Sequence, residues 1–332
     1  MKILVTAQFD AEALATLRRY GEVEHHFYGQ TMRVLAGSKL VKALEGVSVL
    51  VTEVDQVRKA VFAQAPSLRL ISCCRGAPVN VDLAAATEHG VPVLTTPGRN
   101  ADAVADLALL FILALLRRLF PVAAILRQEG DGMEKLAKVF TQFQGAELWN
   151  KTVGLVGLGA VGRAAATRLL AFGARVVAFD PYVSAEEASL AGVQLLSLDE
   201  LLAQSDIVSL HAPITDQTRN MIGEREFGLF KRGAYLVNTA RADLTDEDAL
   251  YHALRSGHLA GAALDVFKDE PPSPDNPLLS LDNVIATPHV GGHTSEVITH
   301  QSRIAAEDLV RMFEGRPPLH CANPEALAGF RL

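Results

Sequence analysis

Cysteine is scarce in this 332-residue sequence, which contains only Cys73, Cys74 and Cys321. The three residues form no CxxC motif, have no spacing typical of metal ligands, and are odd in number. The neighbouring Cys73 and Cys74 are interpreted as packing residues at a strand end. This scarcity argues against a disulfide-rich secreted scaffold and favours a reducing compartment, so we expect a cytoplasmic protein.

An excess of positive charge is also missing. Lys and Arg total 31 against 38 Asp and Glu, which gives a formal net charge of −7. Proteins that bind nucleic acids usually carry a basic footprint, so we expect no nucleic-acid partner. Hydrophobic residues make up 49% and charged residues 21% of the chain, and this composition and length are typical of a globular protein of about two domains.

No hydrophobic run has the length of a membrane span. The most apolar segment, residues 107–116, has about half of the roughly 20 residues that a bilayer requires. Because this segment is apolar around its whole circumference, we expect a helix that is buried between domains or between subunits. The first ten residues enter a strand pattern directly, without the features of a signal peptide. We therefore expect neither export nor a membrane partner.

Short apolar runs alternate with helical patterns along the first 97 residues. Strands are predicted at KILVTA, VSVLVTE, LRLISCC and VPVLTTP, with helices between them. Parallel strands need a crossover that is long enough to hold a helix, so this alternation predicts βαβ units. A second series of six strands begins at Lys151, a number typical of a doubly wound nucleotide-binding sheet. The sequence therefore predicts an α/β fold with two doubly wound domains.

Three further segments complete the organisation. Asn100 is expected to cap a helix that runs from about residue 101 towards residue 127, and Pro121 is expected to kink or break that helix. Residues 128–150 have weak periodicity and are interpreted as an arm or connector. Residues 294–314 are again helical and can carry the chain back across the first domain.

Gly157, Gly159 and Gly162 form a GxGxxG pattern. The pattern alone is weak evidence, but here it ends an apolar strand and opens a helix with apolar residues on one face. In this setting the first glycine permits a tight turn, the second lets the backbone approach a pyrophosphate, and the third allows close packing of helix on strand. The helix N-terminus then supplies N–H donors and partial positive charge for the phosphates.

Asp180 follows the next predicted strand, 18 residues after Gly162. Its carboxylate can accept hydrogen bonds from both ribose hydroxyls of the adenosine half of a dinucleotide, and it repels a 2′-phosphate. No arginine follows it, because the next residues are Pro181 and Tyr182. The sequence therefore predicts NAD rather than NADP. The alternative is a strand-to-helix turn with an acidic strand cap and no nucleotide.

Four motifs together resemble one enzyme family. They are, in chain order, GLVGLGAVGR at 154–163, VNTAR at 237–241, DVFKDEPP at 265–272 and TPHVGG at 287–292. They are similar to motifs of the D-isomer-specific 2-hydroxyacid dehydrogenases, and the resemblance covers nearly the whole chain. It implies a Rossmann NAD-binding domain at residues 99–286, inserted in a flavodoxin-like catalytic domain made of residues 1–98 and 287–332.

The resemblance implies that Arg241, Glu270 and His289 are catalytic, and their chemistry suits these roles. Arginine offers a planar, permanently charged fork for carboxylate and carbonyl oxygens. Histidine titrates near neutral pH, so it can act as a base in oxidation and as an acid in reduction. A carboxylate at Glu270 can hold the imidazole in place. The alternative for Arg241 is a structural ion pair, and for any single histidine a surface or core position.

A metal site is not expected near this histidine. His289 and His293 are four residues apart, but Gly291 and Gly292 oppose a helix between them. No acidic third ligand is close in the sequence, so the spacing alone does not indicate a metal.

The resemblance also implies contacts with substrate and cofactor. The substrate carboxylate is expected at the backbone N–H groups of Gly76 and Ala77, since Pro78 has none to donate. Arg75 either adds charge for a second anionic group or is a solvated surface residue. Asn100 matches a position that lines the substrate pocket. Further cofactor contacts are implied at Ala160, Val161, His211, Pro213, Thr239, Ala240, Asp265 (to the nicotinamide carboxamide) and Gly291.

The leading hypothesis is an NAD-dependent oxidoreductase that interconverts a D-2-hydroxy acid and a 2-keto acid in the cleft between its domains. The family resemblance adds a homodimer formed through residues 107–116 and 128–148. One alternative is oxidation of phosphoglycerate or phosphoerythronate, which Arg75 and Arg99 favour and Glu53 opposes. Another is a non-catalytic, NAD-sensing protein similar to a transcriptional corepressor. The identity of the 2-hydroxy acid, its phosphorylation and the direction of the reaction stay open.

Overall fold

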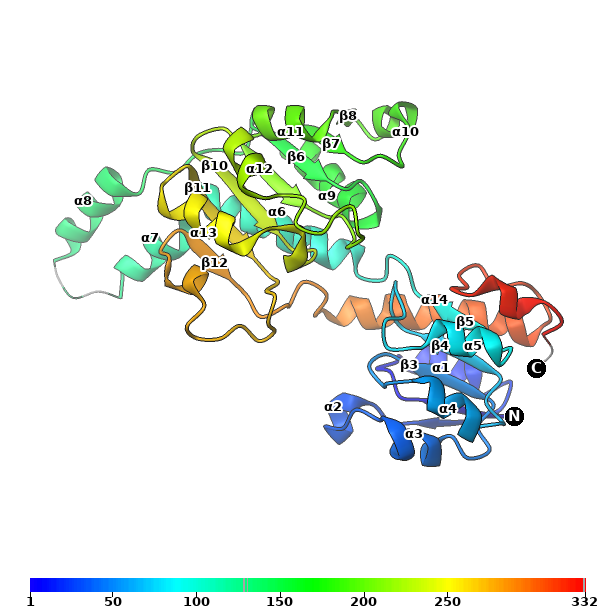
Figure 1. The fold of residues 1–332 in the computed structure, drawn as a ribbon. Helices are drawn as coiled ribbons and strands as arrows, with labels where there is room; N and C mark the ends of the chain where they lie inside the picture. Colours follow the sequence, from blue (N-terminus) through cyan, green and yellow to red (C-terminus); the bar gives the residue numbers. More distant parts are fainter. Residues whose placement is uncertain (128, 130, 331) are drawn as a thin grey trace. The chain divides into compact units, whose positions relative to one another are not determined.

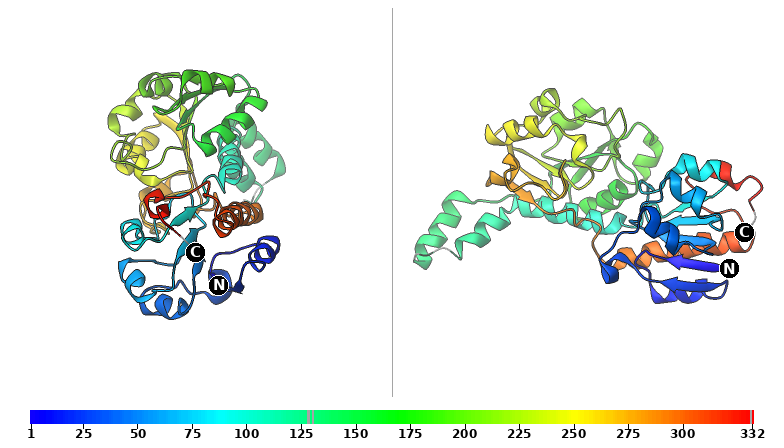
Figure 2. Two further views of the ribbon diagram at one scale, coloured as in Figure 1. Left: turned by 90° about the vertical axis from the view of Figure 1, so that its right-hand side faces the viewer. Right: turned by 60° about the horizontal axis from the view of Figure 1, so that its bottom comes forward.

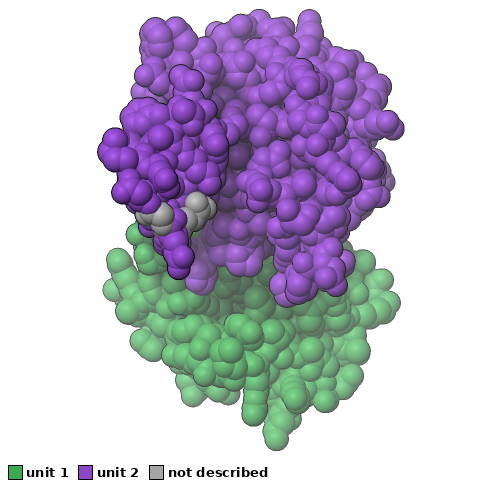
Figure 3. Space-filling view, turned by 90° about the vertical axis from the view of Figure 1, so that its left-hand side faces the viewer, with its two compact units in different colours: residues 1–99, 294–332 green, residues 100–293 purple. Residues whose placement is uncertain are grey.

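The computed structural model describes residues 1–127, 129, 131–330 and 332, which separate into two compact units. Unit 1 comprises Met1–Arg99 and Thr294–Leu332, and unit 2 comprises Asn100–His293. Figure 3 colours the two units separately, and Figure 1 shows that each has a sheet of its own. The predicted α/β fold class, with one doubly wound domain inserted in another, is confirmed.

Unit 1 contains a five-stranded parallel sheet in the order β2-β1-β3-β4-β5. Its strands are β1 (Lys2–Val5), β2 (Glu22–His25), β3 (Val49–Thr52), β4 (Leu70–Cys73) and β5 (Val93–Thr95). Its helices are α1 (Ala11–Leu17), α2 (Tyr28–Thr31), α3 (Gly37–Ala43), α4 (Lys59–Gln64), α5 (Leu83–Glu88) and α14 (Ser295–Phe313), with a 3₁₀ turn at Pro324–Leu327. The helix predicted at residues 294–314 is therefore confirmed and packs within unit 1 against α1.

The two faces of this sheet are built from alternate residues of each strand. Leu4, Leu50 and Ile71 pack with α3, α4 and α5 on one face. Ile3 and Val49 pack with α1 and α14 on the other face. Because both faces are covered by helices, the central strands are apolar throughout, as expected for a buried parallel sheet.

Strand β2 was absent from the sequence expectation, which had four strands in this region. Its sequence Glu-Val-Glu-His is polar at alternate positions and partly exposed, because β2 is the edge strand beside β1. An edge strand with few apolar residues gives little periodic signal. The buried free thiols of Cys73 and Cys74 pack in the core at the end of β4, as interpreted from the sequence. Burial raises the pKa of Cys73 to about 12.

Unit 2 contains a parallel sheet of seven strands in the order β12-β11-β10-β9-β6-β7-β8. Its strands are β6 (Thr152–Val156), β7 (Arg175–Phe179), β8 (Gln194–Leu195), β9 (Ile207–Leu210), β10 (Ala234–Asn238), β11 (Leu259–Leu264) and β12 (Val284–Ala286). Its helices are α6 (Ala101–Leu116), α7 (Leu119–Ile125), α8 (Gly132–Gln142), α9 (Ala160–Ala171), α10 (Ala185–Leu190), α11 (Leu198–Gln204), α12 (Glu224–Leu229) and α13 (Glu247–Arg255), with 3₁₀ turns at Ala242–Leu244 and Pro277–Ser280. The expected count of six strands was therefore wrong by one, because β8 has two residues and no apolar run.

Helix α6 is mostly buried within unit 2 itself. Phe111, Ile112 and Leu115 pack in the core formed with α9 and one face of the seven-stranded sheet. The expectation that this apolar helix must be buried between domains or subunits was wrong for most of its length. The sheet and α9 together cover more of its circumference than one neighbouring face can, and Leu110 is the large apolar residue that stays exposed.

The break after α6 lies earlier than expected. The helix ends at Leu116, Arg118 adopts a left-handed conformation with φ of 48°, and α7 then begins at Leu119. Pro121 lies in the first turn of α7. Backbone N–H groups in a first turn have no acceptor within the helix, so a proline, which lacks an N–H, is tolerated there. Asn100 precedes α6, but its side chain accepts no capping hydrogen bond, so the predicted cap was wrong.

Helices α7 and α8 lie side by side and project from the body of unit 2 (Figure 2). The predicted arm thus contains a helix, and the side chains of Met133, Leu136 and Phe140 on one face of α8 are all exposed. In the described part of the chain no single helix is long and apolar enough to cross a membrane. Helices α6 and α7 pass that test only as a pair, with a bend of 58° between them.

Candidate active site

The glycine-rich turn joins β6 to α9, and its geometry explains each glycine. Gly157 has φ of 98°, and a Cβ there would lie 2.7 Å from the backbone nitrogen of Ala212. A Cβ on Gly162 would lie 2.2 Å from the carbonyl oxygen of Gly157, so only glycine lets α9 pack this closely. A Cβ on Gly159 would meet nothing within 4 Å. Gly159 thus faces open space at the start of a 12-residue helix.

Ala160 and Val161 form the first turn of α9. No side chain caps this helix, so the N–H donors of its first turn are available to an anion. Open space beside Gly159 and free donors at the helix start are what a bound pyrophosphate requires. The turn therefore fits a dinucleotide.

Asp180 follows β7 and is tied to the glycine turn. Its Oδ2 accepts a hydrogen bond of 2.8 Å from the backbone N–H of Leu158, and its Oδ1 accepts one of 2.9 Å from Tyr182. The carboxylate is half-buried and each oxygen has a second lone pair. It therefore has acceptor capacity for ribose hydroxyls beside the turn.

His211 follows β9 on the other side of the turn. Its backbone N–H donates to Val156, and its Nε2 lies 3.0 Å from the Ser209 hydroxyl. Burial lowers the pKa of His211 to about 4, so the ring is neutral at pH 7. Its Nδ1 and the hydroxyl of Thr239, which follows β10, are buried without a hydrogen-bond partner among the described residues. Pro213 lies two residues after His211 and is exposed.

The strands β10, β11 and β12 are neighbours and parallel, so their carboxyl ends share one edge of the sheet. Arg241, Asp265 and His289 each follow one of these ends. Ligands of open α/β sheets bind outside this edge. The topology therefore brings together, within unit 2, the residues that the motifs singled out.

Arg241 is exposed, and its Nη1 donates a hydrogen bond of 2.6 Å to the carbonyl of Ala240. Among the described residues its guanidinium forms no ion pair, so its charge is available to an anion. The buried side chain of Asn238 braces this turn. Its amide oxygen accepts from Ala240 N–H, and its amide nitrogen donates to the Arg241 carbonyl at 2.8 Å. The sequence did not reveal this role, because nothing local indicates a bracing amide.

His289 and Glu270 form a hydrogen-bonded pair, with 2.7 Å between Nδ1 and Oε2. Both side chains are partly exposed, and the second ring nitrogen of His289 is turned to neither Glu270 nor another described partner. The Glu270 carboxylate also accepts a hydrogen bond from the Phe267 N–H at 3.3 Å. This arrangement leaves Nε2 of His289 able to exchange a proton with a ligand.

Asp265 holds the loop that carries His289. Its carboxylate is 1% exposed and accepts three hydrogen bonds, from the Thr287 hydroxyl at 2.5 Å and from the N–H groups of Val290 and Gly291 at 2.8 Å. His289 has φ of 57°, a conformation that few non-glycine residues adopt. Three charge-assisted hydrogen bonds around it can stabilise this conformation. This positioning role adds to the nicotinamide contact expected for Asp265.

Gly291 and Gly292 let this loop pack closely on its neighbours. A Cβ on Gly291 would lie 2.9 Å from the Asp265 carboxylate. A Cβ on Gly292 would lie 3.2 Å from the side-chain nitrogen of Asn100. Asn100, instead of capping α6, thus lies against the loop that follows His289.

Arg75, Gly76 and Ala77 belong to unit 1, where they follow β4. The N–H groups of Gly76 and Ala77 are exposed and have no hydrogen-bond partner among the residues described. Arg75 donates from Nε to the Glu53 carbonyl at 2.6 Å. The turn therefore presents two free N–H donors beside a guanidinium, as anion sites in turns commonly do.

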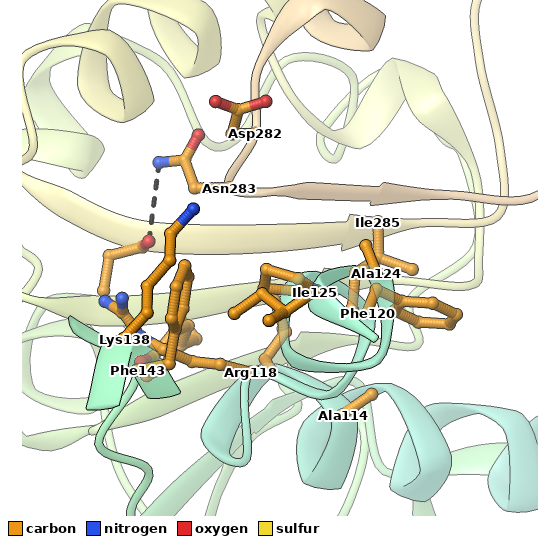
Figure 4. A pocket seen from close by; sticks show the side chains of 14 residues that line it. Ala114, Arg118, Phe120, Ala124, Ile125, Lys138, Phe143, Asp282, Asn283 and Ile285 are labelled. Carbon is orange, nitrogen blue, oxygen red and sulfur yellow. Dashed lines mark hydrogen bonds between the residues drawn. The ribbon is translucent and has the colours of Figure 1, made fainter. Parts of the chain in front are cut away.

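An apolar pocket of about 540 Å³ lies at the opposite edge of the unit 2 sheet. Tyr235 and Ala260 line it from the starts of β10 and β11, and Figure 4 shows Ala114, Phe120 and Ile125 gathered around it. None of the candidate residues lines this pocket, so it is separate from the candidate active site. Over the part of the chain that is described, no group of three or more His, Cys, Asp or Glu side chains is arranged to hold a metal ion.

Comparisons with known proteins agree on one family. Residues 109–291 match the family model described as "D-isomer specific 2-hydroxyacid dehydrogenase, NAD binding domain". The chain is 38% identical over 325 residues to a D-3-phosphoglycerate dehydrogenase of Archaeoglobus fulgidus, covering 97% of this chain and 59% of that protein. It is 33% identical over 327 residues to a glyoxylate reductase of Thermococcus litoralis, covering 98% of each.

A solved structure, the TT0316 protein of Thermus thermophilus, superposes with a TM-score of 0.82 at 38% identity. The superposition covers 97% of this chain and all of that one. The chain thus spans less than two thirds of the phosphoglycerate dehydrogenase that it matches, but the whole length of the other two proteins.

Proposed function

The chain belongs to the D-isomer specific 2-hydroxyacid dehydrogenase family, and from this premise we propose that it is an NAD-dependent oxidoreductase that interconverts a D-2-hydroxy acid and a 2-keto acid. The observation that carries the proposal is the 2.7 Å hydrogen bond between His289 and Glu270, at the same sheet edge as the unpaired Arg241. A titratable group, its carboxylate partner and a free cation are what this reaction requires.

Arg241 binds the substrate. Its planar fork contacts the substrate carboxylate and the oxygen at C2 together, which fixes the orientation of the reacting carbon. The brace from Asn238 limits the motion of the turn that carries Arg241. Positive charge beside the C2 oxygen also stabilises the negative charge that develops there during reduction.

His289 moves the proton. In oxidation Nε2 takes the proton of the C2 hydroxyl, and in reduction it returns a proton to the carbonyl oxygen. Glu270 accepts the hydrogen bond from Nδ1–H, holds the ring, and stabilises the imidazolium by its opposite charge. Asp265 keeps the loop in position through Thr287, Val290 and Gly291.

The residues that hold NAD follow the carboxyl ends of the unit 2 strands. The N–H groups of Gly159, Ala160, Val161 and Gly162 would donate to the pyrophosphate of bound NAD, and Asp180 would accept from its ribose hydroxyls. Bound NAD supplies or accepts the hydride. Further contacts come from His211, Pro213, Thr239, Ala240, Asp265 and Gly291. The unpartnered atoms of His211 and Thr239 support this assignment.

Unit 1 contributes to substrate binding through Gly76 and Ala77, whose N–H groups donate hydrogen bonds to the substrate carboxylate. The free state of both donors supports this role. Arg75 adds a positive charge beside them, and in unit 2 Asn100 lines the substrate site next to Gly292.

Turnover of 2-keto acids tests the proposed activity. NADH consumption is measured with glyoxylate, hydroxypyruvate and longer 2-keto acids, and each assay is repeated with NADPH. We expect turnover with at least one acid, and a kcat/KM with NADH about tenfold or more above that with NADPH, because Asp180 repels a 2′-phosphate. If NADH binds in a fluorescence titration but no 2-keto acid supports turnover, the enzyme assignment is wrong and a binding protein is favoured.

The protein is further proposed to be a cytoplasmic homodimer. The exposed residues Met133, Leu136 and Phe140 form an apolar face of α8, and apolar faces of this kind are usually covered. A second copy of the chain is the proposed cover. The free thiols of Cys73, Cys74 and Cys321 support a reducing compartment.

A further inference from the structure

Four side chains form a polar cluster at the carboxyl edge of the unit 1 sheet. Glu53, Arg75 and Arg99 follow β3, β4 and β5, and Gln301 comes from α14. The Arg99 Nη1 lies 2.8 Å from the Glu53 Oε1, with side-chain exposures of 17% and 24%. Gln301 is 1% exposed and accepts a hydrogen bond from Arg99, while its Nε2 lies 3.5 Å from the other Glu53 oxygen. The cluster therefore contains a partly buried ion pair between Arg99 and Glu53, and the buried amide of Gln301 holds Arg99 in place.

The polar cluster lies beside the turn that presents the free N–H donors of Gly76 and Ala77. Arg75 is covalently next to Gly76 and donates to the Glu53 carbonyl at 2.6 Å. The Thr96 N–H donates to the Arg75 carbonyl at 2.8 Å, and a Cβ on Gly76 would lie 3.7 Å from the Cα of Pro97. The ends of β3, β4 and β5 therefore place the cluster within reach of a small acid whose carboxylate binds at Gly76 and Ala77.

The charges of the cluster nearly balance. Arg75 and Arg99 supply two positive charges and Glu53 one negative charge. Arg99 is neutralised by its pair with Glu53, whereas Arg75 forms no ion pair with any described carboxylate. Counted for the cluster alone, one substrate carboxylate brings the total to neutral. A phosphate on the substrate would add up to two further negative charges beside the half-buried Glu53, and repulsion between groups this close is costly.

We propose that the polar cluster is a specificity determinant: Glu53, by pairing with Arg99, selects 2-keto acids that carry one negative charge and a short hydroxylated tail, and it rejects phosphorylated ones. This inference rests on the proposed function. The partly exposed Glu53 carboxylate keeps acceptor capacity for a substrate hydroxyl. A methyl tail would cover this carboxylate without replacing its hydrogen bonds to water, which is unfavourable.

Four substrates test the effects of the tail, the hydroxyl and the phosphate on the wild-type protein, without any substitution. Glyoxylate has no tail, pyruvate has a methyl group, hydroxypyruvate adds one hydroxyl to it, and 3-phosphohydroxypyruvate adds a phosphate. For the full-length wild-type chain with NADH, we expect kcat/KM for hydroxypyruvate to exceed that for pyruvate by about tenfold or more. We expect kcat/KM for hydroxypyruvate to exceed kcat/KM for 3-phosphohydroxypyruvate by about a hundredfold. An equal or higher kcat/KM for pyruvate or for the phosphorylated acid overturns the proposal.

Glu53→Gln tests the mechanism of selection. The substitution keeps the shape of the side chain but frees the charge of Arg99, so kcat/KM for 3-phosphohydroxypyruvate should rise about tenfold. That for hydroxypyruvate should fall severalfold, and that for glyoxylate should change less than about twofold. Glu88→Gln, which removes an exposed carboxylate of the same unit, is the matched control and should leave all four values unchanged. If a folded Glu53→Gln variant has the same ratios of kcat/KM among the four acids as the wild type, Glu53 does not select the substrate.

The outcomes separate this inference from the function on which it rests. If glyoxylate is turned over but kcat/KM for pyruvate or for 3-phosphohydroxypyruvate equals or exceeds that for hydroxypyruvate, only the role of the polar cluster is overturned. No turnover of any of the four acids overturns the role of the polar cluster, and the proposed function is overturned with it only if the longer 2-keto acids also give no turnover.

Discussion

The two edges of the unit 2 sheet differ in the groups that flank its strands. At the carboxyl edge, β10, β11 and β12 lead into Arg241, Asp265 and His289, and buried polar groups brace the turns. At the amino edge, the same strands begin around a mostly apolar pocket that α7 also lines. One sheet thus has a polar site at one edge and a mostly apolar pocket at the other.

The two edges of the sheet meet different physical requirements. Groups that react need defined positions and partial access to solvent, which short turns braced by side-chain hydrogen bonds provide. A surface that binds another copy needs exposed apolar area, which Met133, Leu136 and Phe140 of α8 provide. If this division is real, substitutions at one edge should leave the property of the other edge unchanged.

The largest expected effect is at His289. His289→Gln keeps a hydrogen bond with Glu270 but removes the titratable ring, so kcat should fall by about 10²–10⁴. His252→Gln, at an exposed histidine of α13, should keep the wild-type kcat. The oligomeric state by light scattering should be the same for both variants. A His289→Gln variant with wild-type kcat would exclude His289 as the acid–base group.

A smaller loss of rate is expected at Asp265. Asp265→Asn replaces one carboxylate oxygen by an NH₂ group, which leaves at least one N–H donor of the His289 loop unpaired at a cost of about 1–3 kcal/mol. We expect kcat to fall about 10–100-fold. The melting temperature of each variant is measured alongside kcat. Thr287→Val removes one of the three donors and should lower kcat less. If the two variants lose stability but keep kcat, Asp265 stabilises unit 2 without positioning His289.

The smallest effect on rate is expected on the arm. Phe140→Asp puts a charge on the apolar face of α8, where the native side chain is 75% exposed. We expect the molar mass by light scattering to fall to that of a monomer at micromolar concentration, with kcat changed less than about threefold. Gln142→Asp adds the same charge on another face of α8 and should stay dimeric. A monomeric wild-type protein would contradict the homodimer.

Much of the fold could be predicted because its signals are local. The alternation of apolar strands and helical patterns predicted two parallel sheets, and glycine spacing after β6 predicted the turn that α9 follows. The strands β2 and β8 were missed because each lies at a sheet edge and lacks an apolar run. The break at Arg118 was misplaced because proline is a known helix breaker, while a left-handed arginine gives no sequence signal.

The candidate site was predictable in its residues and less so in its supports. Motifs singled out Arg241, Glu270 and His289, and their catalytic roles stay predictions. Nothing in the sequence indicated that Asn238 braces one turn or that Thr287 donates to Asp265. These contacts join segments that meet only when neighbouring strands align.

Composition and local patterns were enough to identify the scarce cysteines, the acidic balance, the order of the apolar strands along the chain and the glycines that permit the β6–α9 turn. Those properties depend on composition or on residues a few positions apart. Three further features became visible in the folded chain alone: Glu53 neutralises Arg99, Asp265 is buried under three donors, and the apolar α6 is covered within its own unit. Each of these depends on the packing of distant segments, because burial and hydrogen-bond partners are properties of the folded chain rather than of any one residue.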